Sequence, residues 1–255
     1  GLNEDELQQT FADWNEGVLQ SFLVEITADI FAQTDDQKAG EMLINNILDS
    51  AKQKGTGKWT SQSAMDLGVA IPTIDAAVTM RYLSSLKKER TEAEKVLSGP
   101  NIVVRGDKAI LKKQAEAALH FAMLITYAQG FALLRQASEA MGFGLSLSEV
   151  AKIWRGGCII RAGMLEDFRA AFDRKPDLSN LLVDEEIAAT LMEEVNYLRR
   201  LMVQCVESGV PTATLSASLN YFDSYRTARL PSNLIQAQRD YFGAHTYERL
   251  DKTGA

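Results

Sequence analysis

The dominant pattern along this chain is an apolar residue at every third or fourth position, which is the spacing of one face of an α-helix. Near the N-terminus, Asn3 and Glu6 have the spacing of a capping box that starts a helix. The pattern therefore predicts one long helix from Glu4 to about Gln33. Its apolar stripe consists of Leu7, Phe11, Trp14, Val18, Phe22 and Ile26.

The same spacing predicts further helices over most of the remaining chain. Pro72 suits the first turn of one of them, and Ser146 and Glu149 form a second capping-box pattern. No segment alternates apolar and polar residues as a half-buried strand would, so the predicted fold class is all-α, a multi-helix domain with long central helices and no significant sheet. Residues 102–104 alone are expected to be briefly extended. The predicted helices are 40–52, 59–67, 72–89, 91–97, 107–141, 147–155, 158–172, 185–208, 213–227 and 231–242.

The longest predicted helix, 107–141, is apolar nearly all round in its middle, and such a helix must be enclosed by others. Its stretch 117–134 approaches the composition of a membrane span, yet it contains His120 and Gln129, so a buried central helix explains it better. The chain divides into three predicted parts. These are a long connecting helix at 1–34, an all-α core at 35–230, and a C-terminal helix and tail at 231–255.

The formal net charge is −7 and the isoelectric point is about 5.0. An acidic surface repels nucleic acid and anionic lipid, so neither nucleic acid nor a membrane is an expected partner. The N-terminus is acidic where a secretory signal would be basic and then apolar. Cys158 and Cys205 lie in apolar surroundings, which indicates reduced core thiols in a cytoplasmic protein. With two histidines and two cysteines, no metal site is predicted.

The most unusual segment is 54–60, KGTGKWT. Its glycines let the backbone approach an anion, Lys54 supplies positive charge, and Thr56 supplies a hydroxyl donor. It is not a P-loop, because Trp59 stands where a serine or threonine is needed and Lys52 stands where the first glycine is needed. Anion binding and a flexible loop between helices both remain open.

Three other charged side chains are candidate ligand contacts. Arg81 lies in mid-helix among apolar neighbours, where an arginine is more often a surface or ion-pair residue. Arg239 and His245 are about 120° apart on a continuous helix, which suits a shared ligand poorly unless the helix ends at Gly243. An exposed tail with a charge pair between Arg239 and Asp240 is the alternative.

In combination, these segments resemble the 6-phosphogluconate dehydrogenase family, the decarboxylating enzymes of the pentose phosphate pathway. The resemblance covers essentially the whole chain. The matching segments are WNEGVLQSFL at 14–23, KGTGKWT at 54–60, RYLSSLK at 81–87, YAQGF at 127–131, IWRGGCIIR at 153–161 and LPSNLIQAQRDYFGAHTY at 230–247.

The resemblance implies roles for five positions. Lys54 and Thr56 match residues that contact 6-phosphogluconate, and Arg81 matches the ligand of its phosphate. Arg239 and His245 match residues that reach into the partner's site in a homodimer, so they need not act on their own subunit. Lys54, Arg81 and Arg239 would then bind the carboxylate and the phosphate of the substrate. An acidic protein would thus have a locally basic pocket.

The resemblance also implies NADP-dependent oxidation and decarboxylation of 6-phosphogluconate to ribulose 5-phosphate and CO2. The family's NADP-binding Rossmann domain and its catalytic lysine and glutamate precede the segment that this chain matches. We therefore expect no catalytic residue in this chain and no dehydrogenase activity from it alone. The alternatives are a helical dimerisation scaffold that binds no ligand and a related dehydrogenase of an unphosphorylated hydroxy acid.

Overall fold

The computed structural model describes residues 1–100 and 106–252. Within these residues the regular elements are helices, and the β-type pairing is limited to two isolated bridges, Ser21–Ala162 and Thr34–Met42. The predicted all-α fold class is confirmed, while the extended segment predicted at 102–104 lies outside the described residues. The chain forms two compact units, Gly1–Leu219 and Asn220–Ala255, and each is described by itself.

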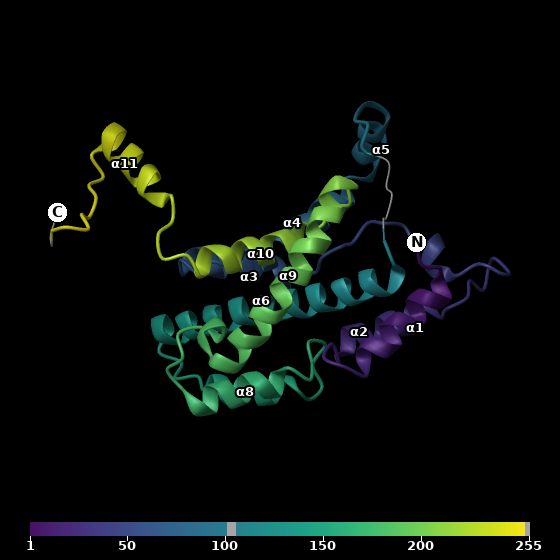
Figure 1. Ribbon diagram of the computed structural model, residues 1–255, viewed down its shortest axis with the longest axis horizontal. Coiled ribbons are helices and arrows are strands. Elements are labelled where there is room, and N and C mark those ends of the chain that lie inside the picture. The colour runs from purple at the N-terminus through teal and green to yellow at the C-terminus, as the bar shows by residue number, and fades with distance from the viewer. Residues whose placement is uncertain (101–105, 253–255) are drawn as a thin grey trace. The chain divides into compact units, whose positions relative to one another are not determined.

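The N-terminal region is a pair of packed helices, α1 (Glu4–Asn15) and α2 (Phe22–Phe31). The single helix predicted from Glu4 to Gln33 is therefore wrong. The side-chain oxygen of Asn15 accepts the Ser21 backbone N–H at 3.0 Å, and the Ser21 hydroxyl in turn accepts the N–H of Val24 as the cap of α2. Such local side-chain bonds compete with helix continuation. α1 and α2 pack on each other (Figure 1), and the ring of Phe11 lies 5.8 Å from that of Phe31, while Val18 of the predicted stripe is exposed.

The helix predicted at 40–52 is also wrong. Only a short 3-10 helix, η1 (Leu43–Asn46), forms there, and Gly40 adopts a left-handed φ of 85°. Asparagine, aspartate and serine are frequent in this stretch, and their side chains offer the backbone alternatives to helical bonds. Residues 47–55, called the strap below, have no regular secondary structure.

Three helices follow the strap: α3 (Thr56–Asp66), α4 (Pro72–Ser85) and α5 (Lys87–Val96). α3 begins at Thr56 rather than at Trp59, because Gly55 takes a φ of 110° that lets the chain turn into the helix. α4 starts at Pro72 as predicted but ends before Leu86, where the backbone leaves the helical region and α5 begins.

The centre of the first unit is α6 (Lys108–Met141), which packs mainly on α9 (Glu185–Glu207) (Figure 1). Asp107 caps α6, and Gly142 ends it with a left-handed φ of 68°. By length and composition α6 could cross a membrane, but 56% of its apolar window is buried inside the protein, and buried core helices meet the same criterion. The prediction of one long helix is confirmed, and neighbouring helices enclose it in part, because one side of it lines a cavity.

An aromatic cluster joins α6 to α7 (Leu147–Trp154) and α8 (Leu165–Arg174). The ring of Phe131 on α6 lies 5.1 Å from that of Trp154 and 5.2 Å from that of Phe172, centroid to centroid. α8 starts later than predicted, because residues 158–164 form turns rather than helix. A short 3-10 helix, η2 (Leu181–Val183), leads into α9.

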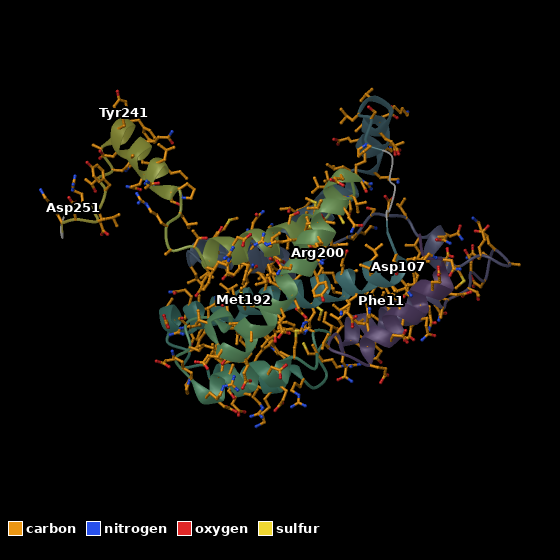
Figure 2. All side chains as sticks on the ribbon, viewed as in Figure 1. Phe11, Asp107, Met192, Arg200, Tyr241 and Asp251 are labelled. Carbon is orange, nitrogen blue, oxygen red and sulfur yellow. The ribbon has the colours of Figure 1, made fainter. Side chains whose placement is uncertain are left out.

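The second unit contains the end of α10 (Ala213–Tyr225) and the helix α11 (Ser232–Gly243). α11 buries none of its residues. Tyr241, labelled in Figure 2, is 95% exposed, and three further apolar side chains of α11 are also exposed. These are Leu234, Ile235 and Phe242. The three-part division at 1–34, 35–230 and 231–255 stays a prediction.

Candidate phosphosugar site

The strap is held along α4 by hydrogen bonds to its backbone and side chains. The Ala51 N–H donates to the Ser84 hydroxyl oxygen at 2.9 Å. The Gln53 side-chain amide donates to the Val78 carbonyl at 3.0 Å. The Arg81 guanidinium donates to the carbonyl of Lys52. The irregular strap thus lies alongside α4. Arg81 contacts it at Lys52, two residues before Lys54.

The segment KGTGKWT is the N-terminus of a helix rather than a flexible loop. Thr56 is the first residue of α3, and the first turn contains no acidic residue. Backbone N–H groups at the start of a helix have no partner within it, and the helix dipole places partial positive charge there. Lys54 adds a full charge directly before this point. These features make the segment suited to binding an anion, which is one of the two interpretations that the sequence left open.

Close contact between α3 and α4 depends on Gly57. A β-carbon at this position would lie 2.9 Å from the Cγ2 atom of Val78, which is closer than side chains tolerate. The absence of a side chain therefore lets the two helices approach. Lys54, Thr56 and Arg81 consequently lie in one region of the first unit, which is the arrangement the resemblance requires. Their roles toward a ligand stay predictions.

A buried polar network fixes the start of α4. Gln129 on α6 is fully buried and accepts the backbone N–H of Thr73, which lies in the first turn of α4, at 3.0 Å. The Gln129 amide nitrogen donates back to the Thr73 hydroxyl, also at 3.0 Å. That hydroxyl lies 3.1 Å from the hydroxyl of Ser218 on α10, which donates to the Thr214 carbonyl. The helix that carries Arg81 is thus tied to α6 and α10.

A cavity of about 1150 Å³ opens beside the segment KGTGKWT. Thr56 and Trp59 of α3 line it together with apolar side chains of α2, α6 and α7. Burial, with a smaller effect from Cys158, raises the pKa of Tyr127 in its wall to about 12, so this phenol stays neutral near pH 7. Because its walls are mostly apolar, the cavity suits an apolar surface better than a sugar phosphate.

The C-terminal tail turns back onto α11. The helix ends at Gly243, and Ala244 and Thr246 take left-handed φ values of 50° and 58°. The Thr246 N–H donates to the Asp240 carboxylate at 2.9 Å, and the His245 ring packs edge-on against Phe242 at 6.2 Å between centroids. The helix thus ends at Gly243, which the sequence left open as a possibility. Arg239 and His245 belong to the second unit, and their approach to a ligand stays a prediction.

Comparison with known proteins decides the family. The family defined by the C-terminal domain of 6-phosphogluconate dehydrogenase matches residues 1–255. The chain belongs to this family. A decarboxylating 6-phosphogluconate dehydrogenase of Synechococcus elongatus is 51% identical over 257 residues, covering 100% of this chain and 55% of the relative. The NADP(+)-dependent, decarboxylating enzyme of Bacillus subtilis is also 51% identical, and the chain covers 54% of it.

A solved structure of the family agrees with the fold. The 6-phosphogluconate dehydrogenase of Plasmodium falciparum, studied in its apo form and with its cofactor NADP+ or its substrate 6-phosphogluconate, superimposes with a TM-score of 0.96 at 41% identity. The match covers 99% of this chain and 54% of that one. The chain therefore spans about half the length of the relatives it matches, and the family expected from the resemblance is confirmed.

Other sequence-based expectations concern residues outside the site. His120 in α6 has its Nδ1 atom 2.7 Å from a carboxylate oxygen of Glu194 on α9, so it is a core histidine with a partner, as expected. Cys158 and Cys205 are both free thiols, but each is only partly buried, so the prediction that they lie in the core is wrong. Among residues 1–100 and 106–252, no cluster of three histidine, cysteine, aspartate or glutamate side chains is placed to hold a metal ion.

The sequence analysis missed the residues that support the site. The sequence marks Gln129 only as a polar residue in an apolar helix. This could have predicted its supporting role, because a buried amide must find hydrogen-bond partners. Asp49, Lys87 and Arg90, which hold the start of the strap, carried no signal, because charged residues of this kind normally cover exposed surfaces.

Proposed function

We propose that this chain is the substrate-binding and dimerisation portion of an NADP-dependent 6-phosphogluconate dehydrogenase. The whole protein would oxidise and decarboxylate 6-phosphogluconate to ribulose 5-phosphate and CO2. The observation that carries the proposal is the contact of the Arg81 guanidinium with the strap two residues before Lys54, close in sequence to the start of α3 at Thr56, within a family whose named relatives have this activity.

The chemistry of the ligand fits these groups. 6-Phosphogluconate carries a carboxylate and a phosphate, with a phosphate charge of about −1.5 to −2 near pH 7. Arg81 presents a fork of donors that matches phosphate oxygens. Lys54 and Thr56 add an ammonium group and a hydroxyl donor next to the helix N-terminus. Anchoring the substrate at its charged end fixes the orientation of its reacting carbon, which is how this portion contributes to the rate.

A second copy of the chain completes the site in this proposal. Arg239 and His245 would reach the substrate of the partner subunit in a homodimer. Two observations support an interface. α11 exposes apolar side chains that a solitary helix would leave in water, and the cavity beside α3 has apolar walls. The competing proposal is a dimerisation scaffold without ligand binding. Both observations agree with it as well, so the two proposals differ in whether the chain binds 6-phosphogluconate.

The cofactor belongs to the part of the protein that the relatives have beyond this chain. Its described residues contain no β-strand from which a dinucleotide-binding turn could start. When bound, NADP accepts the hydride. The residues of this chain hold and orient the substrate, so the chain alone should not reduce NADP. We expect the protein to be cytoplasmic, with neither nucleic acid nor a membrane as partner.

The test is calorimetric titration of 6-phosphogluconate into the chain and into Arg81→Ala, together with the NADPH assay on the full-length protein that carries it. We expect Arg81→Ala to abolish measurable binding and to raise the KM for 6-phosphogluconate at least tenfold. Steady NADPH production by the isolated chain would contradict the proposal. The scaffold would be favoured by a different set of results. The chain would be a dimer by gel filtration and bind no 6-phosphogluconate, and the full-length protein would show no activity.

A further inference from the structure

The start of the strap is held by a charged clasp that involves both α4 and α5. The Arg90 guanidinium donates to a carboxylate oxygen of Asp49 at 3.0 Å and to the Asp49 backbone carbonyl at 3.1 Å. It also donates to the carbonyl of Ser84, in the last turn of α4, at 2.9 Å. The Lys87 ammonium lies 2.8 Å from the other Asp49 oxygen. One side chain thus joins the strap to the end of α4.

The clasp is suited to holding a backbone in place. Carbonyls in the last turn of a helix lack partners within it, and a cation there is favourable. The fork of an arginine binds two or three oxygens in a fixed geometry, which the single ammonium of a lysine cannot reproduce. Hydrogen bonds from Lys87 and Arg90 lower the pKa of Asp49 to about 2, so the carboxylate is charged near pH 7, where the substrate phosphate takes its second charge.

The clasp has a consequence for Arg81. In this structure the Arg81 guanidinium holds the strap at the Lys52 carbonyl. In the proposed function the substrate phosphate competes for that guanidinium, because a phosphate oxygen carries more negative charge than a carbonyl. Once Arg81 turns to the phosphate, the strap depends on its remaining contacts. In the part of the chain that the structure describes, the remaining charge-assisted contact is the clasp, and the others are single neutral hydrogen bonds at Ala51 and Gln53.

We infer that Arg90 is a positioning residue that keeps Lys54 and Thr56 in register while Arg81 binds the substrate phosphate. The inference rests on the proposed function and goes beyond it by assigning a role to a residue that touches no substrate. Arg90 acts through the strap, so its loss should weaken substrate binding and leave the chemical step unchanged.

The first experiment uses the full-length protein that carries this chain. Arg90→Ala should raise the KM for 6-phosphogluconate about tenfold, the effect of roughly one charge-assisted hydrogen bond, with kcat and the KM for NADP within about twofold of wild type. The KM of Arg90→Lys for 6-phosphogluconate should lie between those of wild type and Arg90→Ala. The matched control is Arg135→Ala, because Arg135 also holds a loop, through the carbonyls of Asp177 and Leu178, but away from the strap. It should leave the KM unchanged.

The second experiment needs no turnover. Amide hydrogen exchange should become at least tenfold faster at Ala51 and its strap neighbours in Arg90→Ala and Arg90→Lys, and stay unchanged in the middle of α6. Unchanged KM and unchanged strap exchange would overturn the inference and leave the proposed function standing. A wild-type protein without activity on 6-phosphogluconate would overturn the proposed function. In that case, faster strap exchange would show a structural clasp only and would also overturn the positioning role.

Discussion

Gln129 offers the sharpest test of how α4 is held. The four groups of its network form a directional chain. The amide of Gln129 donates to the Thr73 hydroxyl, that hydroxyl can donate to Ser218, and Ser218 donates to the Thr214 carbonyl. At the same time the Gln129 oxygen accepts the Thr73 N–H. Gln129, Thr73 and Ser218 are 0%, 4% and 0% exposed, so water cannot replace a lost partner.

The perturbation is Gln129→Met, which roughly preserves volume and removes both hydrogen bonds. Each lost bond costs about 1 kcal/mol, and leaving the Thr73 N–H buried without an acceptor adds about 1–3 kcal/mol. We therefore expect the free energy of unfolding to fall by about 3–5 kcal/mol. Ser218→Ala removes the contact with Thr73 and the bond to the Thr214 carbonyl, and should cost about 1–2 kcal/mol. Gln62→Met, at an exposed position on α3, is the control and should stay within about 0.5 kcal/mol.

Urea unfolding of the chain, followed by circular dichroism and tryptophan fluorescence, measures these differences. A double-mutant cycle with Thr73→Val isolates the bond between the two side chains. The double mutant should be more stable than the sum of the single losses predicts, with a coupling of about 1 kcal/mol. If Gln129→Met were as stable as wild type, or if its loss added fully to that of Thr73→Val, the network would not be what fixes α4.

Four further predictions concern single groups. Gly57→Ala, whose new carbon would lie 2.9 Å from Val78, should destabilise the chain by about 1–3 kcal/mol. Gly130→Ala in α6, with nothing within 4 Å, should stabilise it by about 0.5–1 kcal/mol in the same urea assay. The pKa of the Asp49 carboxyl, followed by carbon NMR, should be about 2 in wild type and nearer its ordinary value of 3.8 when its lysine and arginine partners are removed. The pKa of the Tyr127 phenol, followed by ultraviolet absorbance, should be about 12, so a pKa near the ordinary value of 10.0 would contradict its burial.

Helix existence was predictable here, and helix continuity was not. The long helix at 107–141 was identified within a residue or so, because an uninterrupted apolar pattern, Asp107 and Gly142 all agree on its extent. The stripe from Leu7 to Ile26 kept its spacing across the turn at 16–21, so periodicity alone could not detect the break. The deciding contacts were side chain to backbone, from Asn15 to Ser21, which a helical pattern does not encode.

In the site, too, the sequence could predict some features and not others. The two glycines of KGTGKWT signal an unusual backbone, and the sequence left open whether that meant flexibility or a ligand. In the structure they act differently. Gly55 provides the left-handed turn that starts α3, and Gly57 provides the space for Val78. Spacing could suggest Lys54 and Thr56 because they lie in the segment itself. It could not suggest Arg90, because its contacts with Asp49 span 41 residues of sequence, and an irregular strap takes its geometry from distant side chains rather than from its own residues.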